Sequence, residues 1–263
     1  MGIVDWDQLW ELDMQSTGRT RLRDIKLWDG LAWKVDDGQL SGLNDAQLDL
    51  VGHGHRSIIE IGPGRGRLTI PLAKRCELLT AVEPSATMRS RLMTDCARQG
   101  INNIHLLAKR WEDIIVGEDL VPHELVLASY SMFMSDLSEQ LKKMDEASLR
   151  SVYIFVPAEQ RIPEDVQRAI YGRNVTTGLS EHTILFNALY ELGIEANVQI
   201  LHHKTMAFYE SIDKATNDLA WFYNIPDERK TALYKHLEAV MIQKDGGFYL
   251  ERTRKVGVVW WKK

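Results

Sequence analysis

The stretch "SIIEIGPGRGRLTIPLA", residues 57–73, places an acid and three closely spaced glycines directly after a short apolar run. A strand that ends in glycines and leads into a helix lets the backbone approach a nucleotide closely, because glycine lacks a side chain and adopts positive φ readily. Pro71 falls near the first turn of the following helix, where backbone N–H groups have no helical partner. The stretch therefore predicts a strand, a ligand-binding loop and a helix.

From residue 57 onward, apolar runs typical of strands alternate with helical periodicity, which is the pattern of a parallel sheet covered on both faces. After the second strand, Ser85 is a favourable N-cap and Gly100 a favourable end for a helix. Another helix, in "EHTILFNALYELG", has one apolar stripe and ends at Gly193. We expect strands at 57–61, 78–83, 104–107, 125–128 and 151–157, and two longer ones at about 197–208 and 248–261.

Three regions stand outside this alternation. Residues 1–50 precede the first core strand and hold Trp6, Trp10, Trp28 and Trp33, which are half of the eight tryptophans. Residues 158–180 form a polar connection, and residues 211–243 read as two helices joined at "NIPDE". We therefore expect an N-terminal helical cap over 1–50 and a main domain over 51–263 that carries a helical insertion at 211–243. For Trp28 and Trp33 we favour packing on the sheet over a cover for a ligand.

Composition narrows the possible functions. A chain of 263 residues with 44% hydrophobic content suits one large domain, and a net charge of −5 argues against a general nucleic-acid surface. The two cysteines suggest neither a disulfide framework nor a metal cluster. The acidic start does not resemble a secretion signal, and no run reaches the roughly 18 apolar residues needed to span a bilayer. We expect a soluble cytoplasmic protein with no membrane contact.

The spacing of the glycines bears on the ligand. The dinucleotide fingerprint needs its third small residue one position after Gly66, where this chain has Arg67. Pro63 also removes an N–H that a diphosphate could use, and Glu60 would set a negative charge near the phosphates. These features favour a zwitterionic ligand with a cationic centre. We expect both arginines of the loop, Arg65 and Arg67, to face solvent.

At this point the chain resembles the class I S-adenosylmethionine-dependent methyltransferases, whose first motif is an acid followed by Gly-x-Gly-x-Gly, matched by "EIGPGRG". In "AVEPSATM", Glu83 stands nineteen residues after Gly64, where that family holds an acid for the ribose hydroxyls. "AKRWED" falls where the family lines the adenine, and "HELVLASYSMFMSDL" where it faces the methionine moiety. In this last motif the acid that often opens the strand is displaced to Glu124.

The resemblance covers residues 50–157 by motif and the rest of the chain by element order. It implies a Rossmann-like α/β fold, with a seven-stranded, mostly parallel sheet and a C-terminal antiparallel hairpin, to which the sequence adds the helical insertion before the last strand. It implies S-adenosyl-L-methionine as the cofactor. The sequence itself indicates no metal site, because His53 and His55 lack a nearby third ligand. The residues that the resemblance assigns to the cofactor are Glu60, Gly62, Pro63, Gly64, Gly66, Glu83, Pro84, Met88, Arg110, Trp111, Ser129 and Tyr130.

The sequence identifies no catalytic base, so catalysis is attributed to positioning of the acceptor against an already activated methyl group. Of the adjacent His202 and His203, which should face opposite sides of a strand, at most one can reach a pocket. The acceptor is expected to be a small molecule and not a nucleic acid. Two alternatives stay open: a non-catalytic protein that binds S-adenosylmethionine as a partner or regulator, and a dinucleotide-dependent oxidoreductase. The oligomeric state is left open.

Overall fold

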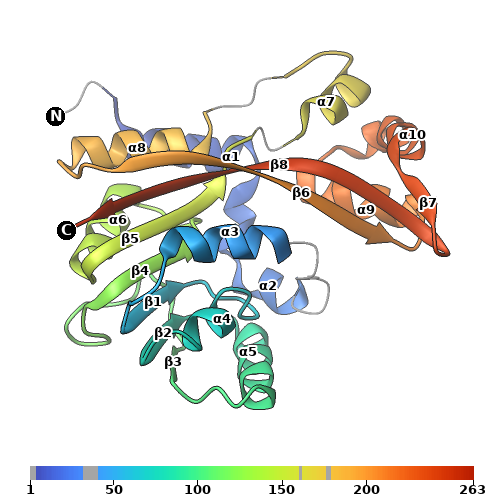
Figure 1. Cartoon of the computed structure of the whole chain (residues 1–263). Coiled ribbons are helices and arrows are strands. Elements are labelled where there is room, and N and C mark those ends of the chain that lie inside the picture. Colours follow the sequence, from blue (N-terminus) through green and yellow to red (C-terminus); the bar gives the residue numbers. More distant parts are fainter. Residues whose placement is uncertain (1–3, 32–40, 160–161, 176–178) are drawn as a thin grey trace.

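The computed structural model describes residues 4–31, 41–159, 162–175 and 179–263. They form one mixed sheet with helices on both faces (Figure 1). The order of strands is β3-β2-β1-β4-β5-β8-β6, and β7 pairs with β8. The first five strands run parallel, whereas β8 runs antiparallel to both β5 and β6. The strands are β1 Ser57–Ile61, β2 Leu78–Val82, β3 Ile104–Leu107, β4 His123–Ser129, β5 Ser148–Pro157, β6 Asn197–Tyr209, β7 Ile242–Lys244 and β8 Gly247–Lys262.

The predicted α/β fold with a C-terminal antiparallel hairpin is confirmed. All seven predicted strands are present within a few residues of their expected bounds, and the described residues add an eighth, β7. This strand has three residues, all of them exposed. An exposed three-residue strand has no apolar run and no alternation by which a sequence would reveal it.

Helices cover the two faces of the sheet in separate layers. Helices α1, α6 and α8 supply Trp10, Leu141 and Leu185 to one buried cluster, and helices α3, α4 and α5 supply Leu43, Leu72 and Leu92 to another. Helices α1, α2 and α3 precede the first strand, and their role as a cap stays a prediction. The helices are α1 Trp6–Ser16, α2 Ile25–Leu31, α3 Ser41–Val51, α4 Thr69–Ala73, α5 Ala86–Arg98, α6 Leu137–Glu146, α7 Glu164–Tyr171, α8 Glu181–Glu191, α9 Ile212–Tyr223 and α10 Lys230–Val240, with short 3-10 turns η1 Arg19–Arg23 and η3 Asp227–Arg229.

Local sequence signals set the ends of several helices. The Ser85 Oγ accepts a hydrogen bond from Met88 N at 3.1 Å, and Gly100 adopts φ +67° after the last turn of α5. A side-chain acceptor at the N-cap and a left-handed glycine after the C-terminus satisfy backbone groups that the helix leaves unpaired. Both predicted ends of this helix are confirmed.

The long hairpin of β6 and β8 extends past the parallel sheet (Figure 1). Its far half packs with α7, α9 and α10 around a third apolar cluster that includes Val166, Leu219, Leu237 and Leu250. Residues 211–243 thus hold the two predicted helices. Within the described part of the chain, none of the helices combines the length and the apolar character that crossing a bilayer requires.

Candidate functional site

The strand order reverses between β1 and β4, and a cavity of about 980 Å³ opens at the carboxyl ends of these strands. In open parallel sheets this switch point is where ligands bind, because the loops after the two strands diverge. Ten of the twelve residues predicted for the cofactor line the cavity, and the two others, Glu60 and Gly66, lie behind its wall. The ten are Gly62, Pro63, Gly64, Glu83, Pro84, Met88, Arg110, Trp111, Ser129 and Tyr130.

The three glycines of the loop serve two purposes. Gly62 has φ +66°, and a Cβ there would lie 2.5 Å from the Ser131 Cβ of the loop after β4. Gly66 has φ +96°, and its Cβ would lie 2.4 Å from Leu92 of α5. Gly64 has φ +57° with no atom within 4 Å of its would-be Cβ. The first and third glycines therefore allow close packing, and the middle one leaves bare backbone on the cavity wall.

Glu83 joins the second strand to this loop. Its Oε2 accepts a hydrogen bond from Gly64 N at 3.1 Å, and its Oε1 accepts one from Ser85 N at 2.8 Å. Burial raises the pKa of Glu83 above its usual value, although these two backbone hydrogen bonds act in the opposite direction. Gly64 and Glu83, which are nineteen residues apart in the sequence, are thus in direct contact, and the carboxylate is held rigidly at the cavity wall.

Glu60 occupies a different position from the one that a ligand contact would require. The side chain is 3% exposed and is absent from the cavity wall, and its Oε2 has no hydrogen-bond partner among the described residues. Burial raises the pKa of Glu60 to about 7, with Thr69 and Arg67 acting against this shift. Its proposed contact with a ligand therefore stays a prediction, and its observed environment is the interior beneath the glycine loop.

Trp111 and Arg110, which follow β3, also line the cavity. Trp111 is 3% exposed, packs into the core below α6, and has an indole Nε1 with no hydrogen-bond partner among the described residues. The Lys143 Nζ lies 5.9 Å from the centre of its ring. Arg110 Nη2 donates to the Arg23 carbonyl at 2.8 Å, which ties this wall to the η1 turn.

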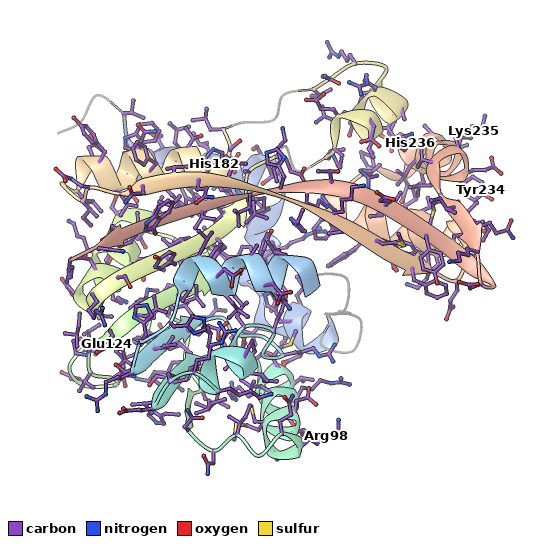
Figure 2. The ribbon with its side chains drawn as sticks, in the orientation of Figure 1. Arg98, Glu124, His182, Tyr234, Lys235 and His236 are labelled. Carbon is purple, nitrogen blue, oxygen red and sulfur yellow. The ribbon has the colours of Figure 1, made fainter. Side chains whose placement is uncertain are left out.

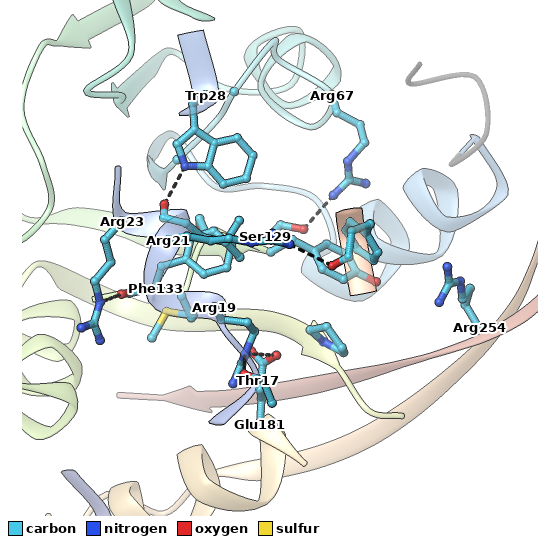
Figure 3. A pocket seen from close by; sticks show the side chains of 18 of the residues that line it. Thr17, Arg19, Arg21, Arg23, Trp28, Arg67, Ser129, Phe133, Glu181 and Arg254 are labelled. Carbon is cyan, nitrogen blue, oxygen red and sulfur yellow. Dashed lines mark hydrogen bonds and ion pairs between the residues drawn. The ribbon is translucent and has the colours of Figure 1, made fainter. Parts of the chain in front are cut away.

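Arg67 corrects the expectation that the loop arginines face solvent. It turns inward (Figure 3), and its guanidinium donates to Ser129 Oγ at 2.7 Å and to Gln47 Oε1 at 2.6 Å. The Ser129 Oγ also accepts from Gln47 Nε2 at 3.2 Å, so the end of β4 is anchored to α3. The next residue, Tyr130, has φ +56°, and burial raises the pKa of its hydroxyl. Sequence reasoning missed Arg67 because its acceptors come from distant segments.

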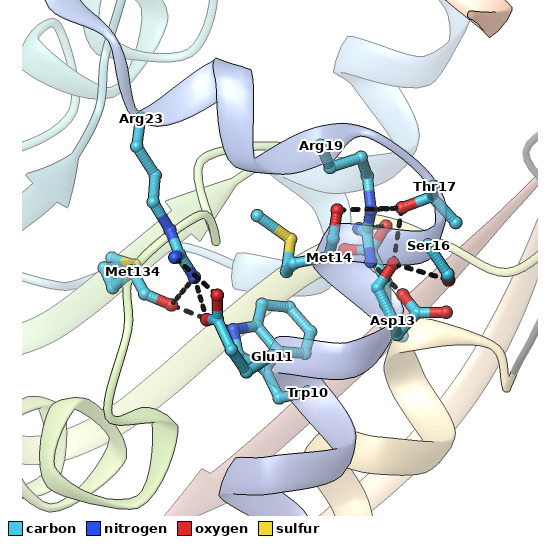
Figure 4. A network of polar contacts seen from close by, with 10 residues as sticks. Trp10, Glu11, Asp13, Met14, Ser16, Thr17, Arg19, Arg23 and Met134 are labelled. Atoms are coloured by element: carbon cyan, nitrogen blue, oxygen red, sulfur yellow. Dashed lines mark hydrogen bonds and ion pairs between the residues drawn. The ribbon is translucent and has the colours of Figure 1, made fainter.

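The N-terminal residues close one side of the cavity, which corrects the expectation that Trp28 packs on the sheet. Trp28 stacks on Phe133 with ring centres 5.8 Å apart, and its Nε1 donates to the Leu22 carbonyl at 2.7 Å (Figure 3). Arg23 donates to the Phe133 carbonyl at 2.6 Å and pairs with Glu11 at 2.7 Å (Figure 4). Trp28 therefore lies on the cavity wall. Trp33 falls outside the described residues.

Glu124, the displaced acid of the motif "HELVLASYSMFMSDL", lies at the amino end of β4, away from the cavity (Figure 2). Its Oε2 accepts from Arg56 N at 2.7 Å and lies 3.5 Å from Arg150 Nη1. These contacts hold the backbone before β1 and the side chain of Arg150 beside the amino end of β4. They assign Glu124 a structural role.

The other half of the cavity is formed by residues that the sequence did not single out as a group. They come from β6, β8, α9 and the connection before α8, and they include His203, Thr205, Tyr209, Trp221, Arg252 and Arg254. His203 lines the cavity whereas His202 is exposed, as the alternation of a strand requires. The described residues contain no group of three His, Cys, Asp or Glu side chains arranged to hold a metal ion.

Comparisons with known proteins agree with this architecture, although no family model matches the chain. The YcgJ protein from Bacillus subtilis superposes with a TM-score of 0.54 at 12% identity, over 87% of this chain and 99% of that one. A candidate methyltransferase from Bacillus halodurans superposes with a TM-score of 0.56 at 10% identity, over 84% of this chain and 98% of that one. At such identities the likeness defines the fold alone. The fold is that of the class I methyltransferases.

One curated relative matches in sequence. A stretch of 50 residues is 44% identical to the ribosomal RNA small subunit methyltransferase A of Desulforapulum autotrophicum. The match spans 19% of this chain and 18% of the relative's length. It is therefore local, and the relative's activity as a whole bears on this chain only as a proposal.

Proposed function

We propose that the protein transfers a methyl group from S-adenosylmethionine to a small-molecule acceptor. The observation that carries the proposal is the contact between Gly64 N and Glu83 Oε2, which sets bare backbone and a carboxylate side by side on the cavity wall. A carboxylate can accept hydrogen bonds from both vicinal hydroxyls of a ribose, and the cationic end of the same ligand is compatible with nearby acids. The diphosphate of a dinucleotide would instead meet negative charge at this point.

The residues present fit this cofactor. Glu83 uses one acceptor position on each oxygen for backbone N–H groups, which leaves further positions for the ribose hydroxyls. The open space beside Gly64 admits a ligand to the main chain. Met88 and Trp111 would border the adenine, with the free Trp111 Nε1 available as a donor. Tyr130 and Ser129 would face the methionine moiety.

Catalysis would then depend on positioning. The cofactor would supply a methyl carbon on a cationic sulfur: an electron pair of the acceptor would bond to that carbon in line as the carbon–sulfur bond breaks, and the sulfur would keep the bonding pair as a neutral thioether. Arg67 and Gln47 hold the end of β4 against α3, so the wall that meets the reacting atoms is fixed before binding. The stacked Trp28 and Phe133 would exclude water from the same space.

A small-molecule acceptor is supported by the enclosure of the cavity. Residues from the N-terminal segment, the β6–β8 hairpin and α9 wall off the space next to the cofactor loop. The net charge of −5 gives little general attraction for polyanions. The local match to a ribosomal RNA methyltransferase makes RNA the competing acceptor.

Two measurements test the proposal. Calorimetric titration should show binding of S-adenosylmethionine and S-adenosylhomocysteine but not of NADH; preference for NADH would establish the oxidoreductase alternative. Incubation with methyl-labelled S-adenosylmethionine should then label a member of a metabolite panel and not total RNA. Label in RNA would show that the acceptor is a nucleic acid and not a small molecule. Binding without transfer to either pool would favour a non-catalytic binding protein.

We also propose that residues 1–50 and 211–243 act as a cap and an insertion that build the acceptor side of the domain 51–263, and that the protein works in the cytoplasm. The cap proposal is supported by Arg23 and Trp28 on the cavity wall, and the insertion proposal by Trp221 of α9. Both cysteines, Cys76 and Cys96, are free. If residues 211–243 are an insertion, deleting them should leave cofactor binding intact. Cell fractionation would test the cytoplasmic location.

A further inference from the structure

The far half of the β6–β8 hairpin presents a row of polar side chains to the cavity. In the antiparallel register His203 pairs with Arg254, and Thr205 pairs with Arg252. Side chains of directly opposed residues share one face of a sheet, and all four of these residues line the cavity. Lys204, between the two inward residues of β6, is 76% exposed on the other face. The hairpin therefore has a cationic inner face next to the proposed cofactor half.

Arg252 is the residue on this face that most needs a ligand. Its side chain is only 10% exposed, and its Nε and Nη2 are buried without a hydrogen-bond partner among the described residues. Among the described residues, the acceptor of Arg252 is Asp165 of α7, at 3.4 Å from Nη1, and it leaves Nε and Nη2 without a partner there. Donors buried without partners are costly and are retained where a ligand supplies the acceptor.

Other free nitrogen atoms lie around the same space. Both ring nitrogens of His203 and the Nε of Arg21 are buried without partners among the described residues. Arg21 sits over the Trp221 ring at 4.5 Å from its centre. The half-buried carboxylates at this end are already engaged: Glu159 with Arg254 at 3.0 Å, and Asp218 with Lys214. Figure 3 shows Arg254 and Arg21 on different sides of the cavity.

We propose that this half of the cavity binds the methyl acceptor through an oxyanion, a carboxylate or a phosphate, that Arg252 holds beside His203. The proposal rests on the proposed methyltransferase function and adds the chemical class of its substrate. A guanidinium with two free, fixed N–H groups matches the two oxygens of such an anion. The flanking aromatic rings, Trp28, Phe133 and Trp221, provide an apolar surface for the remainder of the molecule.

Binding of a simple probe anion tests the proposal without turnover. We would titrate the full-length protein, in the presence of saturating S-adenosylhomocysteine, into trifluoroacetate and follow the fluorine NMR linewidth, with the neutral trifluoroacetamide as the matched probe. We expect the anion to broaden and the amide to remain sharp. Displacement of trifluoroacetate by benzoate is then compared with its displacement by phenyl phosphate, and the stronger competitor distinguishes a carboxylate site from a phosphate site.

Three variants localise the effect. Arg252→Gln should weaken trifluoroacetate binding about tenfold or more, because the charge-assisted hydrogen bonds are lost. Lys204→Gln removes the same charge from the outer face of the same strand pair and should leave binding unchanged. Asp165→Asn removes the internal competitor for Arg252 and should tighten binding, which would not occur if Arg252 served only to anchor α7.

The outcomes separate this proposal from the one on which it rests. If S-adenosylhomocysteine fails to bind the wild type, the proposed function is wrong. If it binds, and trifluoroacetate is not broadened or is broadened equally with Arg252→Gln, the acceptor proposal alone is wrong. Normal affinity of the Arg252→Gln variant for S-adenosylhomocysteine shows that the fold is intact, and Asp165→Asn gives the answer independently if that variant misfolds.

Discussion

Replacing Glu60 with glutamine should change how the stability of the protein depends on pH. Glu60 is buried on β1, and burial raises its pKa from 4.5 to about 7. A carboxyl group whose pKa is higher in the folded state binds more protons there than in the unfolded chain. The protonated Glu60 therefore contributes fully to the free energy of unfolding below pH 4.5, and this contribution is lost as the pH rises through 7. Glutamine has the same shape and does not titrate.

The size of the effect follows from that shift. A difference of about 2.5 pKa units, at roughly 1.4 kcal/mol per unit, corresponds to about 3 kcal/mol between the two limits. The free energy of unfolding of the Glu60→Gln variant, minus that of the wild type, should thus rise by about 3 kcal/mol from pH 4.5 to pH 8. Most of the rise falls between pH 5 and 7. Any loss of stability that the substitution causes equally at every pH cancels from this difference between pH 4.5 and pH 8.

Urea unfolding at half-unit steps of pH measures the difference directly. The exposed Glu118 provides the matched control, because Glu118→Gln makes the same chemical change at the protein surface. A flat or falling difference for Glu60→Gln would show that the buried carboxyl is not destabilised by burial, and the reasoning would fail. Because Glu60 lies behind the cavity wall, affinity for S-adenosylhomocysteine should change less than about threefold; a loss above tenfold would establish the ligand contact that the resemblance implies.

Other substitutions test the loop and the acceptor side. Glu83→Ala should weaken S-adenosylhomocysteine binding by about a hundredfold in calorimetry, because two hydrogen bonds to a charged group are lost; unchanged affinity would refute the assignment. Gly66→Ala should lower the urea midpoint more than Gly54→Ala, since both glycines have positive φ but only Gly66 would place a Cβ against Leu92; equal midpoints would exclude the packing role. Burial lowers the pKa of His203 below its ordinary value, and a protonated imidazole adds a positive charge beside the proposed anion site. Trifluoroacetate binding should therefore tighten as the pH falls through that lowered pKa in the wild type, and His203→Asn should lose this tightening; identical profiles would remove His203 from the anion site.

The cofactor half of the cavity could be predicted because its residues follow strands. The carboxyl ends of parallel strands meet at one edge of a sheet, so the positions of Gly64, Glu83 and Ser129 in the sequence already placed them together. Side-chain direction within a strand was harder to predict. Glu60 alternates with Ile59 and Ile61, and whether it points to a ligand or into the interior depends on how the following loop turns. Arg67 of the loop was misjudged for another reason, since the groups that accept its hydrogen bonds, Gln47 and Ser129, lie far from it in the sequence.

The acceptor half could not be predicted because the register of one hairpin creates it. His203 and Arg252 are separated by 48 intervening residues that contain two helices, and each alone resembles an ordinary polar position on a strand. Only the pairing of Thr205 with Arg252 brings the two onto one face, and a shift of one residue would turn Arg252 outward. The insertion between the strands also supplies Trp221 and Lys214 to the same wall. In this protein the segment that interrupts the sheet pattern therefore both fixes the hairpin and completes the pocket, so acceptor specificity is expected to change with the insertion while the glycine loop stays the same.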